Sequence, residues 1–255
     1  MRIAFTHNLQ LTSGEEEAEF DTATTVEAIA DALRRLGHDV DLVEVSAPVS
    51  ELVTRLESTR PDLIFNTAEG RFGRAREAFF PALFDQLRLP YTGSDAYVCT
   101  LTLDKRLTNL VVAGAGVDVP RGWLVEASTA TLPDDLPYPL FVKPNFEGSS
   151  KGITEESVVA NRAQLDARVR DLLASYPSGV LVEEFIEGED IVVPFLEACS
   201  PDTGGVLASV QYRIAESVKR RHQIYDYRLK HELSDAVDVD VPALIPAEAA
   251  QRLQA

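Results

Sequence analysis

The apolar residues in the first 66 positions alternate between strand-like and helix-like spacing. Short apolar runs at residues 3–6, 40–45 and 62–66 have the length of strands. Between them, residues 22–36 and 50–58 predict helices, and Gly37 ends the first. The face of that first helix is formed by Val26, Ile29, Ala30, Leu33 and Leu36. The order strand, helix, strand, helix, strand predicts a parallel sheet with right-handed crossovers.

Two polar, glycine-containing segments follow strands of this predicted sheet. Ligands gather beyond the carboxyl ends of parallel strands, so residues 8–21 and 67–76 are candidate site loops. The first holds the acids Glu15, Glu16 and Glu17, which also suit a solvated loop or the acidic start of a helix. The second has glycines and arginines that could hold an anion.

The rest of the chain continues as an α/β pattern and then changes character. After a boundary near residue 94 it predicts helices at 103–115 and 161–176 and strands at 122–126, 140–143 and 180–184. Residues 128–139, with three prolines, form a connection. Apolar runs at 191–196 and 206–214 flank a glycine turn and predict an antiparallel hairpin, and a helix opens after Pro246.

Composition narrows the classes of function. The chain has 255 residues, 45% of them hydrophobic, and a formal net charge of −17, which argues against a nucleic-acid partner. Cys99 and Cys199 are far apart and outside any metal or redox spacing, so two buried thiols in a reducing cytoplasm are expected rather than a disulfide. No apolar run approaches the ~18 residues of a membrane span, and we expect a cytoplasmic protein.

The stretch FVKPNFEGSSKGI, residues 141–153, carries the most chemistry. Lys143 ends an apolar strand and Pro144 keeps it extended, while the small residues that follow let backbone N–H groups approach a ligand. A fixed cation beside a cradle of amides suits a polyphosphate. The alternative is a polar hairpin turn. The P-loop motif and the protein-kinase motifs are absent from the sequence.

A second stretch, residues 180–190, takes an apolar strand into an acidic turn. A flat base could lie against its apolar part, and an acid further along could accept hydrogen bonds from ribose hydroxyls. Taken alone, the same pattern also suits a strand with a solvated acidic end.

In their order along the chain these stretches resemble the ATP-grasp superfamily, and within it the D-alanine–D-alanine ligase-like group. The resemblance is carried by Glu19-Phe20-Asp21 and by residues 65–70, 90–94, 103–105, 141–153, 181–190 and 225–230. It implies a Rossmann-like domain at residues 1–94, an ATP-grasp small lobe at 95–186 and a partial C-terminal lobe at 187–255.

The resemblance also implies roles for residues. Lys105, Lys143 and Lys230 would contact the phosphates of ATP, with Lys143 and Lys230 also acting in catalysis. The loop that closes over the phosphates would consist of Glu147, Gly148, Ser149, Ser150, Lys151 and Gly152, with Ser149 near the transferred phosphoryl group. Glu183, Phe185 and Ile186 would line the adenine site, and Asp190 would bind ribose.

Substrate contacts are implied more loosely, at Glu15, Glu17, Glu69 and His231. Asn66-Thr67-Ala68-Glu69 stands where the family has a histidine-containing motif, and His231 stands where D-alanine ligases have an aromatic residue. The cofactors would be ATP and Mg²⁺, with the metal ligands expected beyond Ala255 and none in this chain.

The implied activity is that of a carboxylate–amine ligase working through an acyl phosphate, on amino acids or small peptides, as a homodimer by analogy with the family. The two substrates stay open. The alternatives are a nucleotide-binding module without ligase activity and, more weakly, a sugar- or nucleotide-binding domain in which residues 147–152 are only a turn.

Overall fold

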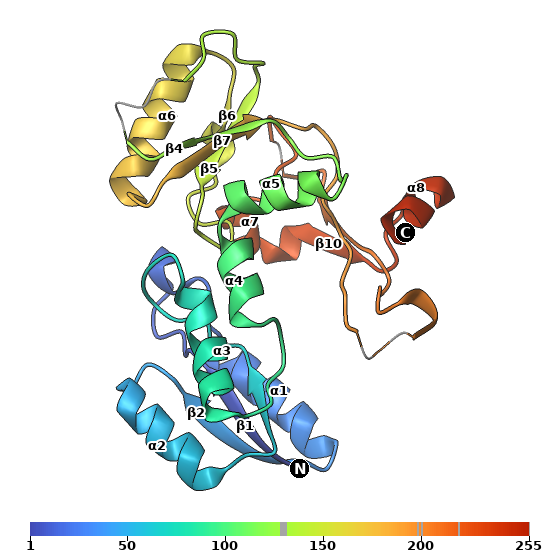
Figure 1. Cartoon of the computed structure of the whole chain (residues 1–255). Coiled ribbons are helices and arrows are strands. Elements are labelled where there is room, and N and C mark those ends of the chain that lie inside the picture. Colours follow the sequence, from blue (N-terminus) through green and yellow to red (C-terminus); the bar gives the residue numbers. More distant parts are fainter. Residues whose placement is uncertain (128–131, 198, 200, 219, 255) are drawn as a thin grey trace. The chain divides into compact units, whose positions relative to one another are not determined.

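The chain folds into two compact units. The computed structural model describes residues 1–127, 132–197, 199, 201–218 and 220–254 (Figure 1). Unit 1 comprises Met1–Val119 and Asn145–Ser149, and unit 2 comprises Pro120–Pro144 and Ser150–Ala255. The chain therefore passes between the units at residues 119–120, 144–145 and 149–150. The three-domain division expected from the family resemblance stays a prediction.

Unit 1 is built on the predicted parallel sheet. Its strands β1 (Arg2–His7), β2 (Asp39–Glu44) and β3 (Leu63–Asn66) lie in the order β2-β1-β3, and both pairings are parallel. The crossovers run through α1 (Ala23–Arg35) and α2 (Val49–Thr59), as the apolar spacing predicted. This part of the sequence-based prediction is confirmed.

The two faces of this sheet have separate cores. Successive side chains of a strand point to opposite faces, so Phe5 packs with Val26 and Ala30 of α1, whereas Ala4 belongs to the other face. There it joins a cluster that includes Leu56 of α2 and Phe84 of the next helix. Figure 1 shows α1 and α2 on opposite sides of the strands.

The remainder of unit 1 is helical and departs from the prediction. α3 (Arg76–Leu87) and α4 (Ala96–Leu103) were not predicted, whereas the expected helix at 103–115 is confirmed as α5 (Lys105–Gly114). α4 and α5 are separated because Asp104 is extended, with φ −82° and ψ 92°, and its side chain accepts a hydrogen bond from the Leu107 N–H. Asp104 thus begins a new helix and fixes Lys105 in its first turn.

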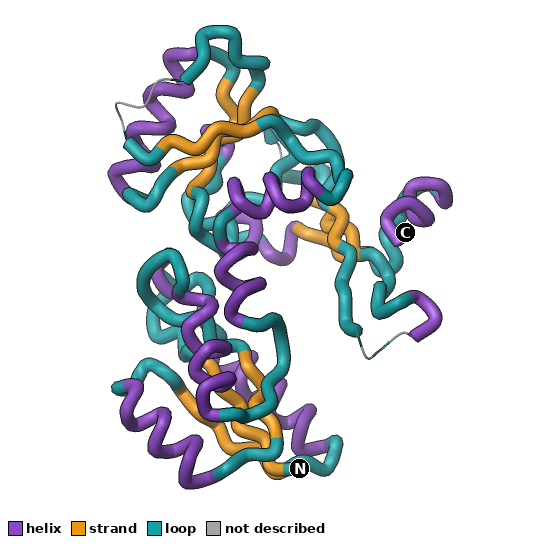
Figure 2. Tube along the Cα trace, viewed as in Figure 1, coloured by secondary structure: helices purple, strands orange, loops and turns teal. Residues whose placement is uncertain are grey.

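Unit 2 contains two sheets, drawn in orange in Figure 2. The first is antiparallel, in the order β4-β7-β5-β6, with α6 (Arg162–Ser175) packed on one face. Its strands are β4 (Gly122–Val125), β5 (Leu140–Pro144), β6 (Val158–Val159) and β7 (Val180–Glu184). Residues 128–131 of the predicted connection lie outside the described residues.

The second sheet of unit 2 has the order β10-β9-β8 and is also antiparallel. β8 (Ile191–Val192) pairs with β9 (Val210–Ile214), which confirms the predicted hairpin, and β10 (Val237–Asp240) completes the sheet. The helices are α7 (Tyr227–His231) and α8 (Ala247–Gln254), the latter directly after Pro246 as predicted. Short 3₁₀ turns lie at Glu15–Glu17, Glu155–Ser157, Pro201–Thr203 and Ser234–Ala236.

Both cysteines are free thiols, but neither is buried as predicted. Cys99 is half-buried on α4, and Cys199 is exposed in the polar connection between β8 and β9. The prediction failed because it rested on residue type alone. Other parts of the chain do not fully cover the segment around either cysteine. Among the described helices, none has the length and apolar character that crossing a bilayer requires.

We predict that Asp104→Ala lowers the free energy of unfolding by about 2 kcal/mol, because a lost N-cap costs about 1 kcal/mol and an unsatisfied buried group about as much again. The second group is the buried Asn145 amide, whose Nδ2 donates to Asp104 Oδ1 at 2.8 Å. Denaturant unfolding measures the change.

The matched control is Asp95→Ala, which removes the hydrogen bond that caps α4 at the Val98 N–H and keeps the bond between Asn145 and Asp104. It should cost about 1 kcal/mol, the value of a cap alone. Equal losses in the two variants would contradict the link between Asp104 and Asn145.

Candidate nucleotide-binding site

The pairing of β5 with β7 separates the core of unit 2 from its candidate site. Phe141 lies opposite Glu183, and Lys143 opposite Leu181. Leu140, Val142, Val180 and Val182 face α6 and are fully buried. The side chains of Phe141, Lys143 and Glu183 therefore project from the other face of the sheet.

Lys143 is held on that face by its neighbours. Its Nζ forms an ion pair with Glu183 Oε1 and lies 5.5 Å from the centre of the Phe141 ring. The Glu183 side chain is 7% exposed and that of Lys143 is 20% exposed. The Lys143 ammonium group can therefore exchange the Glu183 oxygen for an oxygen of a bound ligand while it stays on this face of the sheet.

A pocket of about 420 Å³ opens over this face. It brings together residues that the sequence assigned to a nucleotide, namely Lys143, Glu183, Phe185, Ile186 and Asp190. It also uses residues that sequence reasoning had not assigned to the site, among them Phe141, Ile153, Glu184, Gln223, Ile224 and Tyr225. Gln223 and Ile224 directly precede the quoted 225–230 motif and Tyr225 begins it, which was the available signal for them.

The walls of the pocket suit a flat, partly polar ring. Phe141 and Phe185 approach with ring centres 6.3 Å apart, and Ile153, Ile186 and Ile224 add aliphatic surface. The Phe185 N–H already donates to the Pro139 carbonyl at 3.2 Å. A backbone contact from Phe185 to a bound base would therefore use its carbonyl oxygen.

Asp190 and Tyr225 form a polar edge of the pocket. Limited hydration raises the pKa of the Asp190 carboxyl, although a hydrogen bond from the Tyr225 backbone N–H works in the opposite direction. Tyr225 stacks on Tyr212 with ring centres 5.2 Å apart. Burial, with the nearby Tyr212, raises the pKa of the Tyr225 hydroxyl.

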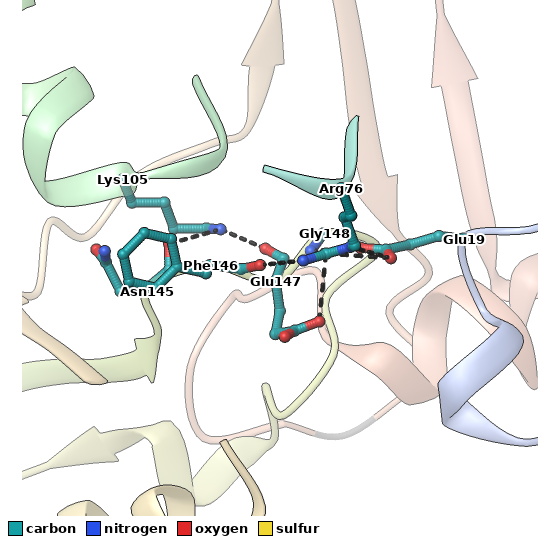
Figure 3. Close-up of polar contacts among 7 residues, drawn as sticks. All are labelled: Glu19, Arg76, Lys105, Asn145, Phe146, Glu147 and Gly148. Atoms are coloured by element: carbon teal, nitrogen blue, oxygen red, sulfur yellow. Dashed lines mark hydrogen bonds and ion pairs between the residues drawn. The ribbon is translucent and has the colours of Figure 1, made fainter. Parts of the chain in front are cut away.

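The glycine–serine loop, residues 145–152, is held at its beginning by unit 1. Lys105 Nζ donates to the Glu147 carbonyl and to the Asn145 carbonyl, the latter at 3.5 Å. Arg76 Nη1 donates to the Phe146 carbonyl at 2.8 Å, and Glu19 Oε1 accepts from the Gly148 N–H at 2.7 Å (Figure 3). We call residues 146–148 the outgoing limb.

Residues 150–153, the return limb, are held by unit 2. Ser150 Oγ donates to the Tyr225 carbonyl at 3.0 Å, and Arg168 Nη2 donates to the Gly152 carbonyl at 2.6 Å. Gly152 has φ +68°, and a Cβ there would lie 2.8 Å from Pro144 and from Tyr176. Only glycine fits this position without displacing its neighbours.

Between the limbs the backbone adopts a conformation that side chains disfavour. Ser149 has φ 48° and Ser150 has φ 57°, so two consecutive non-glycine residues lie in the left-handed region. They stand where the chain passes from unit 1 to unit 2.

The remaining residues predicted to bind ATP or substrate lie elsewhere. Lys230 and His231 are exposed on α7 and do not line the 420 Å³ pocket described above. The His231 ring lies against Tyr227, with centres 4.4 Å apart. Lys105 belongs to unit 1 and Lys143 to unit 2, so their convergence on one triphosphate stays a prediction.

Glu15 and Glu17 lie in a loop of unit 1. Glu15 is exposed. Glu17 accepts from the backbone N–H groups of Thr12 and Leu11 at 2.7 and 2.8 Å, and these bonds, Thr12 first, lower its pKa. The Glu17 carboxylate therefore holds its own loop together.

The acid that contacts the glycine–serine loop is Glu19, which sequence reasoning quoted without assigning a role. Its side chain is 3% exposed. Its carboxylate lies near those of Glu69 and Glu77, with one oxygen atom from each within 4.8 Å of the others. Arg76 donates to both Glu19 oxygens.

The comparisons with known proteins agree with one another. Residues 121–255 match the family model described as D-ala D-ala ligase C-terminus. A D-alanine–D-alanine ligase from Anaeromyxobacter sp. (strain Fw109-5) is 32% identical over 247 residues, which are 95% of this chain and 72% of that protein.

Two solved structures share the fold. The D-alanine–D-alanine ligase from Bacillus anthracis complexed with ATP has a TM-score of 0.71 at 18% identity, covering 100% of this chain and 74% of that one. The VanG D-Ala:D-Ser ligase from Enterococcus faecalis has a TM-score of 0.67 at 21% identity, covering 99% of this chain and 79% of that one.

We predict that nucleotide affinity falls as the pH is lowered through the raised pKa of Asp190. Above that pKa the carboxylate can accept from ribose hydroxyls, and below it the neutral acid accepts poorly. Because the pKa is raised from the ordinary value of 3.8, the loss should begin at a higher pH than for an ordinary aspartate. Calorimetry with a non-hydrolysable ATP analogue at a series of pH values measures it.

Asp190→Asn is the control for this titration. It should bind the analogue more weakly at neutral pH and lack the Asp190 part of the pH dependence, while the titration of the phosphates themselves stays common to both proteins. Identical pH profiles for the two proteins would contradict the role of Asp190.

Proposed function

The chain belongs to the D-alanine–D-alanine ligase family, and we propose that it is an ATP-dependent ligase that joins two amino acids or small peptides through an acyl phosphate. The observation that carries this proposal is the pocket of unit 2, where Lys143, Glu183, Phe185, Ile186 and Asp190 meet. These residues come from two separate sequence stretches that the family resemblance had assigned to one nucleotide.

In this proposal ATP lies along the face of β5 and β7. The adenine ring lies among Phe141, Phe185 and Ile186, and Glu183 accepts a hydrogen bond from it. Asp190 accepts hydrogen bonds from the ribose. The ammonium group of Lys143, now paired with Glu183, turns toward the phosphates, because they carry more negative charge than one carboxylate.

The chemistry requires neutralised charge and exclusion of water. A substrate carboxylate oxygen attacks the γ-phosphorus, the bond to the β,γ-bridging oxygen breaks, and ADP leaves. The amine of the second substrate then attacks the acyl carbon, phosphate leaves, and the amine loses its proton. Lys143 offsets the negative charge that builds up in the first step. The N–H groups of the glycine–serine loop stabilise the same charge by donating hydrogen bonds. The loop also keeps water from the acyl phosphate.

We include Mg²⁺ with ATP because the family uses it, but we assign it no ligands here. Among the described residues, the one acidic cluster that could hold a metal ion consists of Glu19, Glu69 and Glu77. Arg76 donates to Glu19 at 2.8 Å, so a cation already occupies one side of the cluster. The cluster therefore does not fit the ion, and no step above depends on it.

The substrates are proposed at the level of class. The related proteins are named for D-alanine and for the D-Ala:D-Ser pair, which favours small amino acids here. Asn66-Thr67-Ala68-Glu69 and His231 differ from the family pattern at places tied to the substrates, so we propose that this ligase differs in its second substrate. Because the reaction consumes ATP, we place it in the cytoplasm, and we retain a homodimer as the expected state.

The test is ADP release and amide formation with a panel of D- and L-amino acids, using protein made from the complete coding sequence. We predict that Lys143→Ala lowers turnover by about 100-fold or more, the usual cost of removing one preorganised charge from a transition state. Lys143→Arg should retain part of the activity, since it keeps the charge with a different geometry.

The control is Arg170→Ala, which removes one positive charge from the exposed face of α6 in the same unit and should turn over normally. Near-normal turnover in Lys143→Ala would count against the ligase assignment. Binding of ATP without turnover, in wild-type protein and with every amino acid, would instead support a nucleotide-binding module.

A further inference from the structure

We propose that Arg76 is a positioning residue of this ligase: it fixes the outgoing limb of the glycine–serine loop before ATP arrives. The inference rests on the proposed function for its catalytic consequence, but its structural part concerns unit 1 alone. Arg76 begins α3 and is the last residue of the candidate loop 67–76, but the sequence assigned it no role of its own.

The guanidinium group of Arg76 contacts the limb at successive residues. Nη1 donates to the Phe146 carbonyl at 2.8 Å, and Nη2 donates to the Glu147 carboxylate at 3.3 Å. Figure 3 shows the group between the limb and Glu19. The side chains of Arg74 and Phe146 add a cation–π contact, with Arg74 4.4 Å from the ring centre.

The next residue of the limb is held through Glu19. Arg76 Nη2 donates to Glu19 Oε1 at 2.8 Å, and Nε and Nη2 both donate to Oε2, at 3.3 and 3.2 Å. This fork fixes the Glu19 carboxylate, whose Oε1 accepts from the Gly148 N–H at 2.7 Å. A Cβ at residue 148 would lie 2.6 Å from that oxygen, so a larger residue there would displace the Glu19 carboxylate.

The arrangement is buried. The side chains of Arg76 and Glu19 are 6% and 3% exposed. Burial works against the charge of Arg76, but the hydrogen bond and charge of Glu19, with Glu147 and Glu77, outweigh it and raise the pKa of Arg76. A planar group with several fixed donors can serve Phe146, Glu147 and Glu19 together, whereas a lysine ammonium cannot.

The consequence for the reaction is preorganisation. When the outgoing limb is already ordered, ATP need not order it on binding, and the loop closes from Ser149 onward on a fixed base. If the limb were loose, the closed loop would admit water, and acyl phosphate would be hydrolysed to carboxylate and phosphate. ADP would then form without amide.

The experiment compares wild type with Arg76→Lys, using amide hydrogen exchange without nucleotide and the ratio of ADP to amide during turnover. We expect the Gly148 amide to be protected in wild type. In Arg76→Lys it should exchange about tenfold faster or more, the factor that follows from losing charge-assisted hydrogen bonds. The ratio of ADP to amide should rise above one.

The matched control is Arg55→Lys. Arg55 also binds a carboxylate through two nitrogens, to Asp41 at 3.2 and 2.6 Å, and donates to the Leu42 carbonyl at 2.7 Å, but it lies on α2 and its partners lie on β2. In Arg55→Lys, the exchange rate of the Gly148 amide and the ratio of ADP to amide should equal those of wild type. If Arg76→Lys only lowers the melting temperature and otherwise matches Arg55→Lys, Arg76 is merely a structural ion pair and the proposal is wrong.

Two further measurements keep the outcomes distinct. Should Arg76→Lys not fold, Glu147→Gln keeps the Arg76–Glu19 pair and should speed Gly148 exchange by about threefold, as for one weak ion pair. A wild-type Gly148 amide that exchanges as fast as in an unfolded peptide overturns the proposal without any variant. A wild type that releases no ADP refutes the proposed function, whereas the exchange result still decides whether Arg76 fixes the limb.

Discussion

The antiparallel pairing of β5 with β7 is the constraint on which the site of unit 2 depends. Because side chains alternate across the sheet, one pairing register places Val142 and Val182 in the core under α6 and Lys143 and Glu183 on the pocket face. A slip of β5 by one residue would turn Lys143 into the core and expose Val142. The apolar core therefore specifies where the charges stand.

The glycine–serine loop is likewise held in place by residues outside it, at both of its ends. Its outgoing limb is fixed by Arg76, Glu19 and Lys105 in unit 1, and its return limb by Arg168 and the Tyr225 carbonyl in unit 2. Small polar residues bury little area, so packing alone does little to hold the loop. The small residues leave the loop backbone accessible, and side chains from elsewhere in the chain hydrogen-bond to that backbone.

Local pattern predicted the regular elements where one period dominated. The parallel sheet, α1, α2, α6 and the β8–β9 pairing were read correctly, since each has a clear spacing or a glycine turn. α3 was missed because apolar residues lie on nearly all its sides and Pro81 interrupts the pattern. The helix at 103–115 was read correctly as α5, but α4, which ends just before the cap residue Asp104, was missed.

The sequence predicted only those site residues that lie in recognisable motifs. The family resemblance is confirmed by the family model and the curated relatives. Five of its ATP residues, Lys143, Glu183, Phe185, Ile186 and Asp190, share one pocket, although the role of each stays a prediction. The roles of Glu19 and Arg76 were not predicted, because their partners are distant in sequence. Glu19 binds Gly148, which is 129 positions away, and Arg76 binds Phe146, which is 70 positions away. Periodicity carries no information about such distant partners.

The most direct measurement of the central claim is photolabelling with 8-azido-ATP, followed by mass spectrometry of the labelled peptides. We expect label within residues 141–143, 183–190 or 223–225, which line the pocket, and we expect unmodified ATP to protect these residues from labelling. Label confined to the sheet of unit 1, or label that ATP does not displace, would contradict the proposed site.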